Sequence, residues 1–245
     1  MKKIALLFIA LMVSFMSQAQ KDFYELRVYE TTFSGSGLHQ YLENALLPAL
    51  NRQGVKNIGA FDENGLNQPV KVYLFIPYKS MAEYEKVNNA LKTDKAFKAA
   101  SDKYASLLPN QAPYATLEVS MFTAFEGLPR LVKPSGESML FELRTYQSYI
   151  EDAFMRKVKM FNEGELDIFK DTGLHSVFFG EKIAGSQMPC LTYMLAFKDM
   201  EERNANWSKF SAHPEWKKMS ALEEYANTVS RIERVFLKPL KYNQL

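Results

Sequence analysis

The sequence predicts an α+β protein built from two tandem ferredoxin-like units, each with the element order β-α-β-β-α-β. Their antiparallel sheets are expected to pack as a pseudo-dimeric α/β barrel. Three observations predict this class: an internal repeat, the same succession of strand and helix patterns in both halves, and strands that are apolar along their whole length.

The repeat is clearest at the start of each half. The run beginning at Phe23, FYELRVY, returns as LFELRTY beginning at Leu140, an offset of 117 residues. Gly54 returns as Gly173, at an offset of 119, and the run YKSM at Tyr78 returns as FKDM at the same offset. Such a nearly constant offset predicts two copies of one structural unit.

Each copy begins with a strand and a helix. Residues 23–32 and 139–148 alternate between apolar and polar side chains, as strands do. The helices predicted over 37–53 and 151–172 end at Gly54 and Gly173, because glycine readily adopts the left-handed conformation that closes a helix.

Two strands follow in each copy, over 56–62 and 70–77 and over 175–181 and 190–197. Ser80 and Asp199 are then placed to cap a long helical stretch, which is interrupted near Asp94 in one copy and near Pro214 in the other. Final strands are predicted over 114–125 and 228–237. Because residues 70–76 and 191–197 are almost continuously apolar, the open faces of the two sheets are expected to pack on each other.

The first residues have the pattern of a secretory signal peptide. Lys2 and Lys3 precede an apolar run from Ile4 to Met16, and small residues end at Ala19, after which cleavage is predicted. The run of about 13 residues is shorter than the roughly 20 that a membrane span needs. We therefore expect a secreted or periplasmic protein without a membrane span after signal removal. The predicted organisation is a signal peptide over 1–19, domains over 20–126 and 139–245, and a linker over 127–138.

Composition excludes several classes of partner and stabilising bond. Without residues 1–19 the chain has 28 basic and 28 acidic residues, so no general positive field attracts nucleic acid. Cys190 is the single cysteine, so the chain cannot form an internal disulfide.

The second half contains several characteristic motifs: FELRTY from Phe141, FFGE from Phe178, LTYMLAFKDMEER from Leu191, Trp207, and HPEWK from His213. Together they resemble the NIPSNAP family, within the dimeric α/β-barrel superfamily. The resemblance extends over the whole mature chain and implies two tandem NIPSNAP-like domains. It is looser in the first half, where Tyr84 and Asn88 stand in place of Arg203 and Trp207. The second copy is therefore the better candidate for a specialised site, and the resemblance implies no particular reaction.

The motifs of the common catalytic classes are absent. Ser34-Gly35-Ser36-Gly37 lacks the strand-turn-helix context of a serine nucleophile, and no phosphate-binding or dinucleotide-binding loop occurs. The three histidines are scattered without metal-ligand spacing. We therefore expect no catalytic constellation, no metal and no cofactor.

The candidate ligand-binding residues are Arg144, Tyr146, His175, Arg203 and Trp207. Arg203 and Trp207 share one helical face with Met200 and Phe210, which either packs on the sheet as core or lines a pocket. With Arg144 and Tyr146 from the first strand, Arg203 forms a hypothetical small-anion site. The alternative for Arg144, which the strand pattern favours slightly, is an outward-facing residue in a cross-strand ion pair.

His175 opens a strand and shares its expected face with Val177 and Phe179. It is predicted to point into an apolar space, either as a hydrogen-bonded core histidine or as a site residue.

Three functions from different classes follow, in order of preference. The first is binding of a small apolar or anionic molecule between helices and sheet. The second is a protein-interaction or assembly module without a ligand, for which a homo-oligomer is the expected partner. The third, implied by the superfamily's scaffold, is a cofactor-independent monooxygenase-like or isomerase-like enzyme.

Overall fold

The computed structural model describes residues 20–32, 36–65 and 69–245. The signal peptide predicted over 1–19 and the residues Ser34 and Gly35 lie outside these ranges. The first half contains, in order, β1 (Phe23–Thr31), α1 (Ser36–Tyr41), a π-helical turn (Leu42–Leu46), α2 (Leu47–Arg52), β2 (Gly59–Glu63), β3 (Lys71–Tyr78), α3 (Met81–Thr93), α4 (Lys95–Ala105), a 3-10 turn (Pro109–Gln111) and β4 (Tyr114–Ala124).

The second half repeats this succession of elements. It contains β5 (Leu140–Gln147), α5 (Glu151–Met160), a π-helical turn (Phe161–Glu165), α6 (Leu166–Asp171), β6 (His175–Ala184), β7 (Cys190–Phe197), α7 (Met200–Ala212), α8 (Pro214–Ser220), a 3-10 turn (Glu223–Tyr225) and β8 (Arg231–Pro239).

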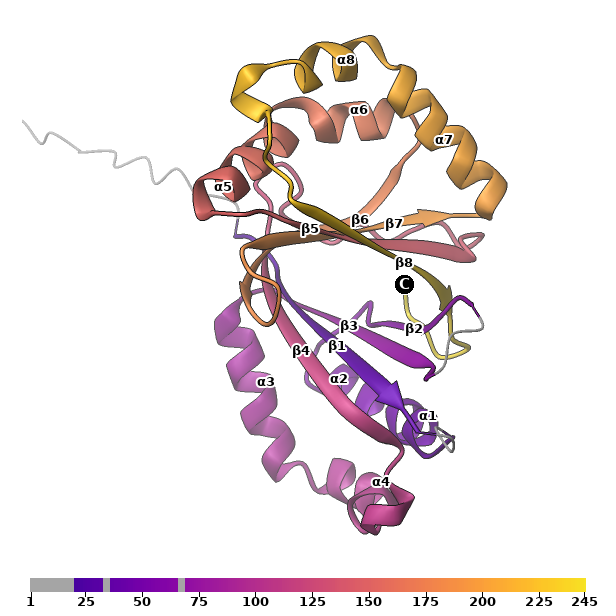
Figure 1. Ribbon diagram of the computed structural model, residues 1–245. Coiled ribbons are helices and arrows are strands. Elements are labelled where there is room, and N and C mark those ends of the chain that lie inside the picture. Colours follow the sequence, from indigo (N-terminus) through magenta and orange to yellow (C-terminus); the bar gives the residue numbers. More distant parts are fainter. Residues whose placement is uncertain (1–19, 33–35, 66–68) are drawn as a thin grey trace, which may run out of the picture.

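The eight strands form one closed antiparallel barrel in the order β1-β3-β2-β8-β5-β7-β6-β4. Within it, β4-β1-β3-β2 and β8-β5-β7-β6 are two four-stranded sheets with the same internal order, which confirms the predicted ferredoxin-like units. The two sheets are joined edge to edge, because β2 pairs with β8 and β4 pairs with β6. Helices α1–α4 cover one side of the barrel and α5–α8 the opposite side (Figure 1).

Alternation along each strand divides the apolar side chains into three cores. On β1, Tyr24 and Leu26 belong to the core inside the barrel, whereas Phe23 and Tyr29 pack under the first-half helices. The interior of the barrel holds several aromatic rings, and the ring of Phe178 stacks on Phe75 with centroids 4.2 Å apart. Because these side chains fill that part of the interior, the space for a ligand has to be sought between helices and sheet.

The predicted caps and helix breaks are confirmed. The side chains of Ser80 and Asp199 accept hydrogen bonds from backbone amides of the first turns of α3 and α7. The breaks fall at Asp94, between α3 and α4, and at His213, between α7 and α8.

Two predicted strand starts were too early. Strand β2 begins at Gly59 because Asn57 has a φ of 56°, which interrupts extended backbone. Strand β8 begins at Arg231 because Thr228 closes a turn, donating from Oγ1 to the carbonyl of Tyr225 at 3.1 Å.

Among the described residues, no helix has the length and apolarity that crossing a bilayer requires.

Candidate functional site

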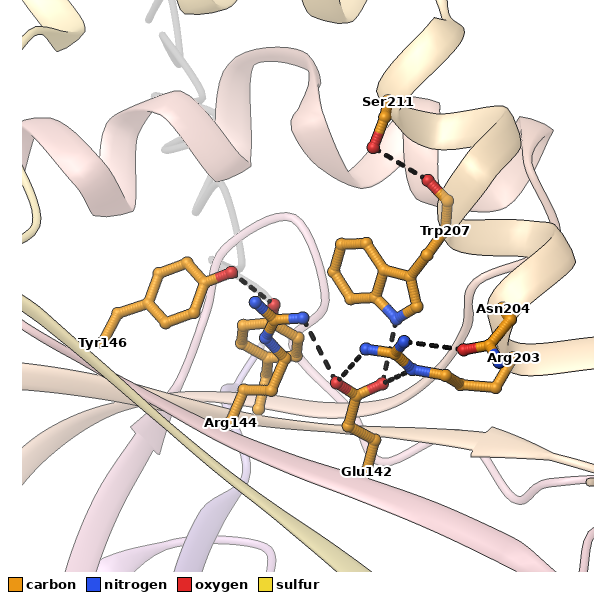
Figure 2. A network of polar contacts seen from close by, with 8 residues as sticks. Glu142, Arg144, Tyr146, Arg203, Asn204, Trp207 and Ser211 are labelled. Carbon is orange, nitrogen blue, oxygen red and sulfur yellow. Dashed lines mark hydrogen bonds and ion pairs between the residues drawn. The ribbon is translucent and has the colours of Figure 1, made fainter. Parts of the chain in front are cut away.

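The centre of the candidate site is Glu142 on β5, whose side chain is 0% exposed. Its two oxygens accept two hydrogen bonds from Arg203, from Nε at 2.8 Å and from Nη2 at 2.9 Å. They also accept one from Trp207 Nε1 at 2.9 Å and one from Arg144 Nη1 at 3.2 Å (Figure 2). One buried carboxylate therefore orients two guanidinium groups and an indole.

Local geometry explains why these residues meet. Glu142, Arg144 and Tyr146 are two residues apart on β5, so all three point to the helix side of the sheet. Arg203 and Trp207 are four residues apart on α7, so they lie on the same face of that helix. The guanidinium carbon of Arg144 lies 4.3 Å from the ring centroid of Trp207 and 5.4 Å from that of Tyr146.

The protonation state of Glu142 follows from two opposing effects. Burial by itself would raise the pKa of this carboxyl, but the hydrogen bonds from Arg203 and Trp207 and the charges of Arg144 and Arg203 outweigh it. The pKa of Glu142 is therefore lowered below its ordinary value. The resulting contribution to stability is present above the unfolded-state pKa and is lost as the pH falls through the lowered folded-state pKa.

A second buried ion pair lies beside this network. Lys157 Nζ on α5 donates to Glu165 Oε2 at 2.6 Å, and the two side chains are 6% and 3% exposed. Eight residues of regular α-helix would separate their positions by about 12 Å along the axis. The π-helical turn over Phe161–Glu165, with non-helical backbone at Gly164, changes the direction of the chain and lets them meet. Burial raises the pKa of Glu165, although the charges of Lys157 and Arg144 act against this shift.

A cavity of about 410 Å³ opens between these groups and the helices. Its lining residues come from β5, α5, the π-helical turn, α7, α8, β8 and the segment before β8: Arg144, Tyr146, Lys157, Glu165, Arg203, Trp207, Phe210, Ser211, Trp216, Val229 and Ile232. The volume lies within the range of small-molecule sites, and the wall combines aromatic rings with a few charged groups.

Two hydrogen-bond donors of β5 belong to this wall. Arg144 lines the cavity and donates to Glu142 from Nη1, whereas its Nε is fully buried, without a partner among the described residues, and is not reached from the cavity. The hydroxyl of Tyr146 accepts a hydrogen bond from Tyr193 at 2.9 Å, which leaves its own hydrogen for another acceptor. Burial raises the pKa of Tyr146, so the phenol stays neutral and can donate.

The charges of the site do not cancel. Arg144, Arg203 and Lys157 are cations, and Glu142 and Glu165 are the carboxylates paired with them, so one positive charge remains without a counter-ion in this group. A buried or partly buried excess charge is unfavourable unless an opposite charge approaches it. The arrangement therefore favours a single negative charge in the cavity.

The first copy keeps part of this arrangement and loses the rest. Glu25 accepts a hydrogen bond from Arg27 Nε at 2.7 Å and another from the hydroxyl of Tyr78 at 3.1 Å. At the positions of Lys157 and Glu165 this copy has Leu38 and Leu46, at the same offset of 119 residues, and both are buried. The first copy therefore has apolar side chains in place of the second buried ion pair, and the charges of Glu25 and Arg27 balance each other, which agrees with the prediction that the second copy is the specialised one.

Four of the five residues predicted from the sequence lie together here: Arg144, Tyr146, Arg203 and Trp207. The cross-strand ion pair considered for Arg144 is wrong. Its ionic partner Glu142 lies on the same strand, and its guanidinium points under α7 because Trp207 covers it. On the helical face, Phe210 and Trp207 reach the cavity whereas Met200 is exposed, so the face is partly core and partly pocket wall.

The expectation that His175 points into an apolar core is wrong, because its side chain is 62% exposed and Nε2 lies 3.7 Å from Glu202 Oε1. The residue lies outside the cavity described above and lines a separate cavity of about 590 Å³. The pairing of β6 with β7 shifts between Ser176 and Phe178, so Val177 and Phe178 both face the barrel interior. The prediction placed His175 on one strand face with Val177 and Phe179 because side chains alternate along a regular strand. The register shift interrupts that alternation.

Sequence reasoning did not place Glu142, Lys157, Glu165 and Trp216 in the site. The repeat contained a usable signal, because Lys157 and Glu165 occupy helix positions that are leucine in the other copy. Within the part of the chain that the structure describes, no group of three or more His, Cys, Asp or Glu side chains is placed to hold a metal ion.

Comparisons with known proteins agree with this architecture. The family model described as NIPSNAP matches residues 141–244. A proposed monooxygenase from Fusobacterium nucleatum superposes with a TM-score of 0.58 at 10% identity, over 90% of this chain and 93% of its own. A second proposed monooxygenase, from Lactobacillus acidophilus, gives 0.57 at 10% identity over 89% and 94%. A mutant chlorite dismutase from Candidatus Nitrospira defluvii gives 0.52 at 5% identity over 90% and 92%.

At these identities the likeness to solved structures shows the fold alone. No curated protein matches the sequence of this chain.

Proposed function

We propose that residues 141–244, which match the NIPSNAP family model, bind a small organic anion in the cavity between sheet and helices. The proposal makes the chain a ligand-binding protein whose first copy completes the barrel and whose second copy holds the ligand.

The observation that carries the proposal is the state of Arg144. Its side chain is 12% exposed and lines the cavity, and the surrounding group has one positive charge in excess. An unmatched, largely buried charge is unfavourable, and an anionic ligand supplies the missing negative charge and accepts a hydrogen bond from the part of the guanidinium that faces the cavity. Tyr146 supplies a second donor on the same side of the cavity.

The alternative functions gain less support. The proteins named as monooxygenases share the fold with this chain at 10% identity, which transfers no reaction. An assembly module without a ligand would leave the excess positive charge without a role.

Replacing Arg144 by methionine is expected to weaken anion binding by about 10-fold or more, because a hydrogen bond to a charged group contributes about 1.5–3 kcal/mol. Glu142 keeps Arg203 and Trp207 in this variant, so the fold is expected to persist. Benzoate is the probe. The change in tryptophan fluorescence measures its binding, because both tryptophans of the chain, Trp207 and Trp216, line the cavity.

The matched control is Arg52→Met, which removes the same charge from an exposed ion pair with Asp94 in the first half. It should bind benzoate as the wild type does. The proposal fails if benzoate produces no saturable response, or if Arg144→Met binds it as tightly as the wild type.

The proposed function includes export of the protein, which rests on the pattern of residues 1–19. We expect the mature protein isolated from its natural compartment to begin at Gln20. Intact-mass measurement checks this, and a mass that includes residues 1–19 would contradict export by a cleaved signal.

A further inference from the structure

We infer that the ligand of the second-copy cavity is a flat aromatic monocarboxylate. This inference rests on the proposed function and specifies both the charge and the shape of the anion. Its carboxylate would lie against Arg144 and Tyr146, and its ring would lie among the aromatic side chains of α7 and α8.

The shape follows from the side chains that face the donors. Trp207, Phe210 and Trp216 form a continuous aromatic group, with ring centroids 5.4 Å apart for the first pair and 4.5 Å for the second. Val229 and Ile232, from the segment before β8 and from β8 itself, add apolar contacts. Aromatic walls favour a flat ring because stacked and edge-to-face contacts add attraction beyond the burial of apolar area.

The position of the charge follows from the donors of β5. The guanidinium carbon of Arg144 lies 4.3 Å from the ring centroid of Trp207, and Figure 2 shows the hydroxyl of Tyr146 pointing toward this guanidinium. A carboxylate has two oxygens that can accept from both donors at once. A ring attached directly to this carboxylate then extends toward Trp207 and Trp216.

The number of charges follows from the pairing already present. Glu142 and Glu165 neutralise two of the three cations, and one positive charge remains. A monocarboxylate matches this charge. A dicarboxylate would bring two negative charges to a group with one excess positive charge, so one buried negative charge would remain unmatched, which is unfavourable. A neutral amide of the same shape would leave the excess positive charge unmatched.

Four probes of matched size test the charge and the shape separately: 2-naphthoate, 2-naphthamide, decahydro-2-naphthoate and naphthalene-2,6-dicarboxylate. Isothermal titration calorimetry on the whole protein measures their affinities. We expect 2-naphthoate to bind about 10-fold or more tightly than the amide or the dicarboxylate. It should bind about 2- to 10-fold more tightly than the saturated acid, which lacks the flat ring.

Variants of Trp216 locate the preference for a flat ring. Trp216→Leu should reduce the preference for 2-naphthoate over the saturated acid, because only Trp207 and Phe210 then remain of the aromatic group, whereas Trp216→Phe should keep the preference. Because Trp216 is half-buried on the surface of the second-half core, both variants are expected to fold, and circular dichroism checks this.

The possible results separate the two proposals. If no carboxylate binds, the proposed function fails, and this inference fails with it. If the saturated acid or the dicarboxylate binds as tightly as 2-naphthoate, and Arg144→Met weakens that binding, the anion site stands and the aromatic monocarboxylate is overturned. A preference for the flat ring that is unchanged in Trp216→Leu would also overturn it.

Discussion

Replacing Glu142 by glutamine is expected to lower the free energy of unfolding by about 3–5 kcal/mol at neutral pH. The substitution keeps the size of the side chain and removes the negative charge that holds Arg144 and Arg203. Two buried cations then face each other across a neutral amide, and the amide NH₂ cannot accept from Trp207. Urea denaturation followed by circular dichroism measures the loss.

The first copy supplies a matched control for this prediction. Glu25 has the same place in the repeat and is also buried, but it faces one cation, Arg27, and the neutral hydroxyl of Tyr78. Glu25→Gln should therefore lower the free energy of unfolding clearly less than Glu142→Gln does. Equal decreases in the two variants would mean that the presence of two arginines at Glu142, instead of one, does not add to stability.

Replacing Lys157 by methionine is expected to lower the free energy of unfolding by about 3–5 kcal/mol, because Glu165 then remains buried without its cation. The double variant Lys157→Leu with Glu165→Leu should have a free energy of unfolding within about 1 kcal/mol of the wild-type value, or above it. The reason is that a buried ion pair often stabilises a protein no more than apolar residues of similar volume. The first copy already contains this solution as Leu38 and Leu46. Thermal or urea unfolding of the three proteins measures the effect.

The pH dependence gives an independent check on the same pair. Burial raises the folded-state pKa of Glu165 above its unfolded-state value, so the folded state binds more protons between the two values. Its unfavourable contribution is therefore absent below the unfolded-state pKa and grows as the pH rises through the folded-state pKa. Without Lys157 the destabilisation by ionised Glu165 should be larger. The difference in free energy of unfolding between Lys157→Met and the wild type should therefore be smaller at pH 4 than at pH 7.

The double variant contains no Glu165, so its own stability should not fall between pH 4 and pH 7 through this group. If Lys157→Met is equally unstable relative to the wild type at both pH values, Glu165 is not the source of its loss.

The candidate site shows how far sequence patterns reach. Arg144 and Tyr146 were assigned to one strand, and Arg203 and Trp207 to one helical face, because period-two and 3.6-residue spacings are local properties. The acceptor that joins them, Glu142, is 61 residues from Arg203 along the chain. No local spacing indicates a contact at that separation. The sequence therefore predicted the strand pair and the helix pair, but it did not predict that Glu142 joins them.

Lys157 and His175 show two different reasons for failure. The partner of Lys157 is eight residues away, a separation at which a regular helix makes no contact, and a π-helical turn brings it close. His175 was assigned to a face by alternation, and a register shift in the pairing of β6 with β7 moved the face. Both depend on a local irregularity that the hydrophobic pattern does not encode.

The sequence by itself determined the two copies, the order of their elements, the helix caps and the preference for the second copy. The copies, the element order and the caps follow from residue spacing and from the conformations that glycine, serine, aspartate and proline favour. The preference for the second copy follows from the closer resemblance of its motifs to the NIPSNAP family. The tertiary structure alone decided that β2 pairs with β8 and β4 with β6, that aromatic rings fill part of the barrel interior, and that one excess positive charge faces a cavity. Strand pairing, packing and electrostatic balance depend on residues far apart in the chain, and folding brings those residues together.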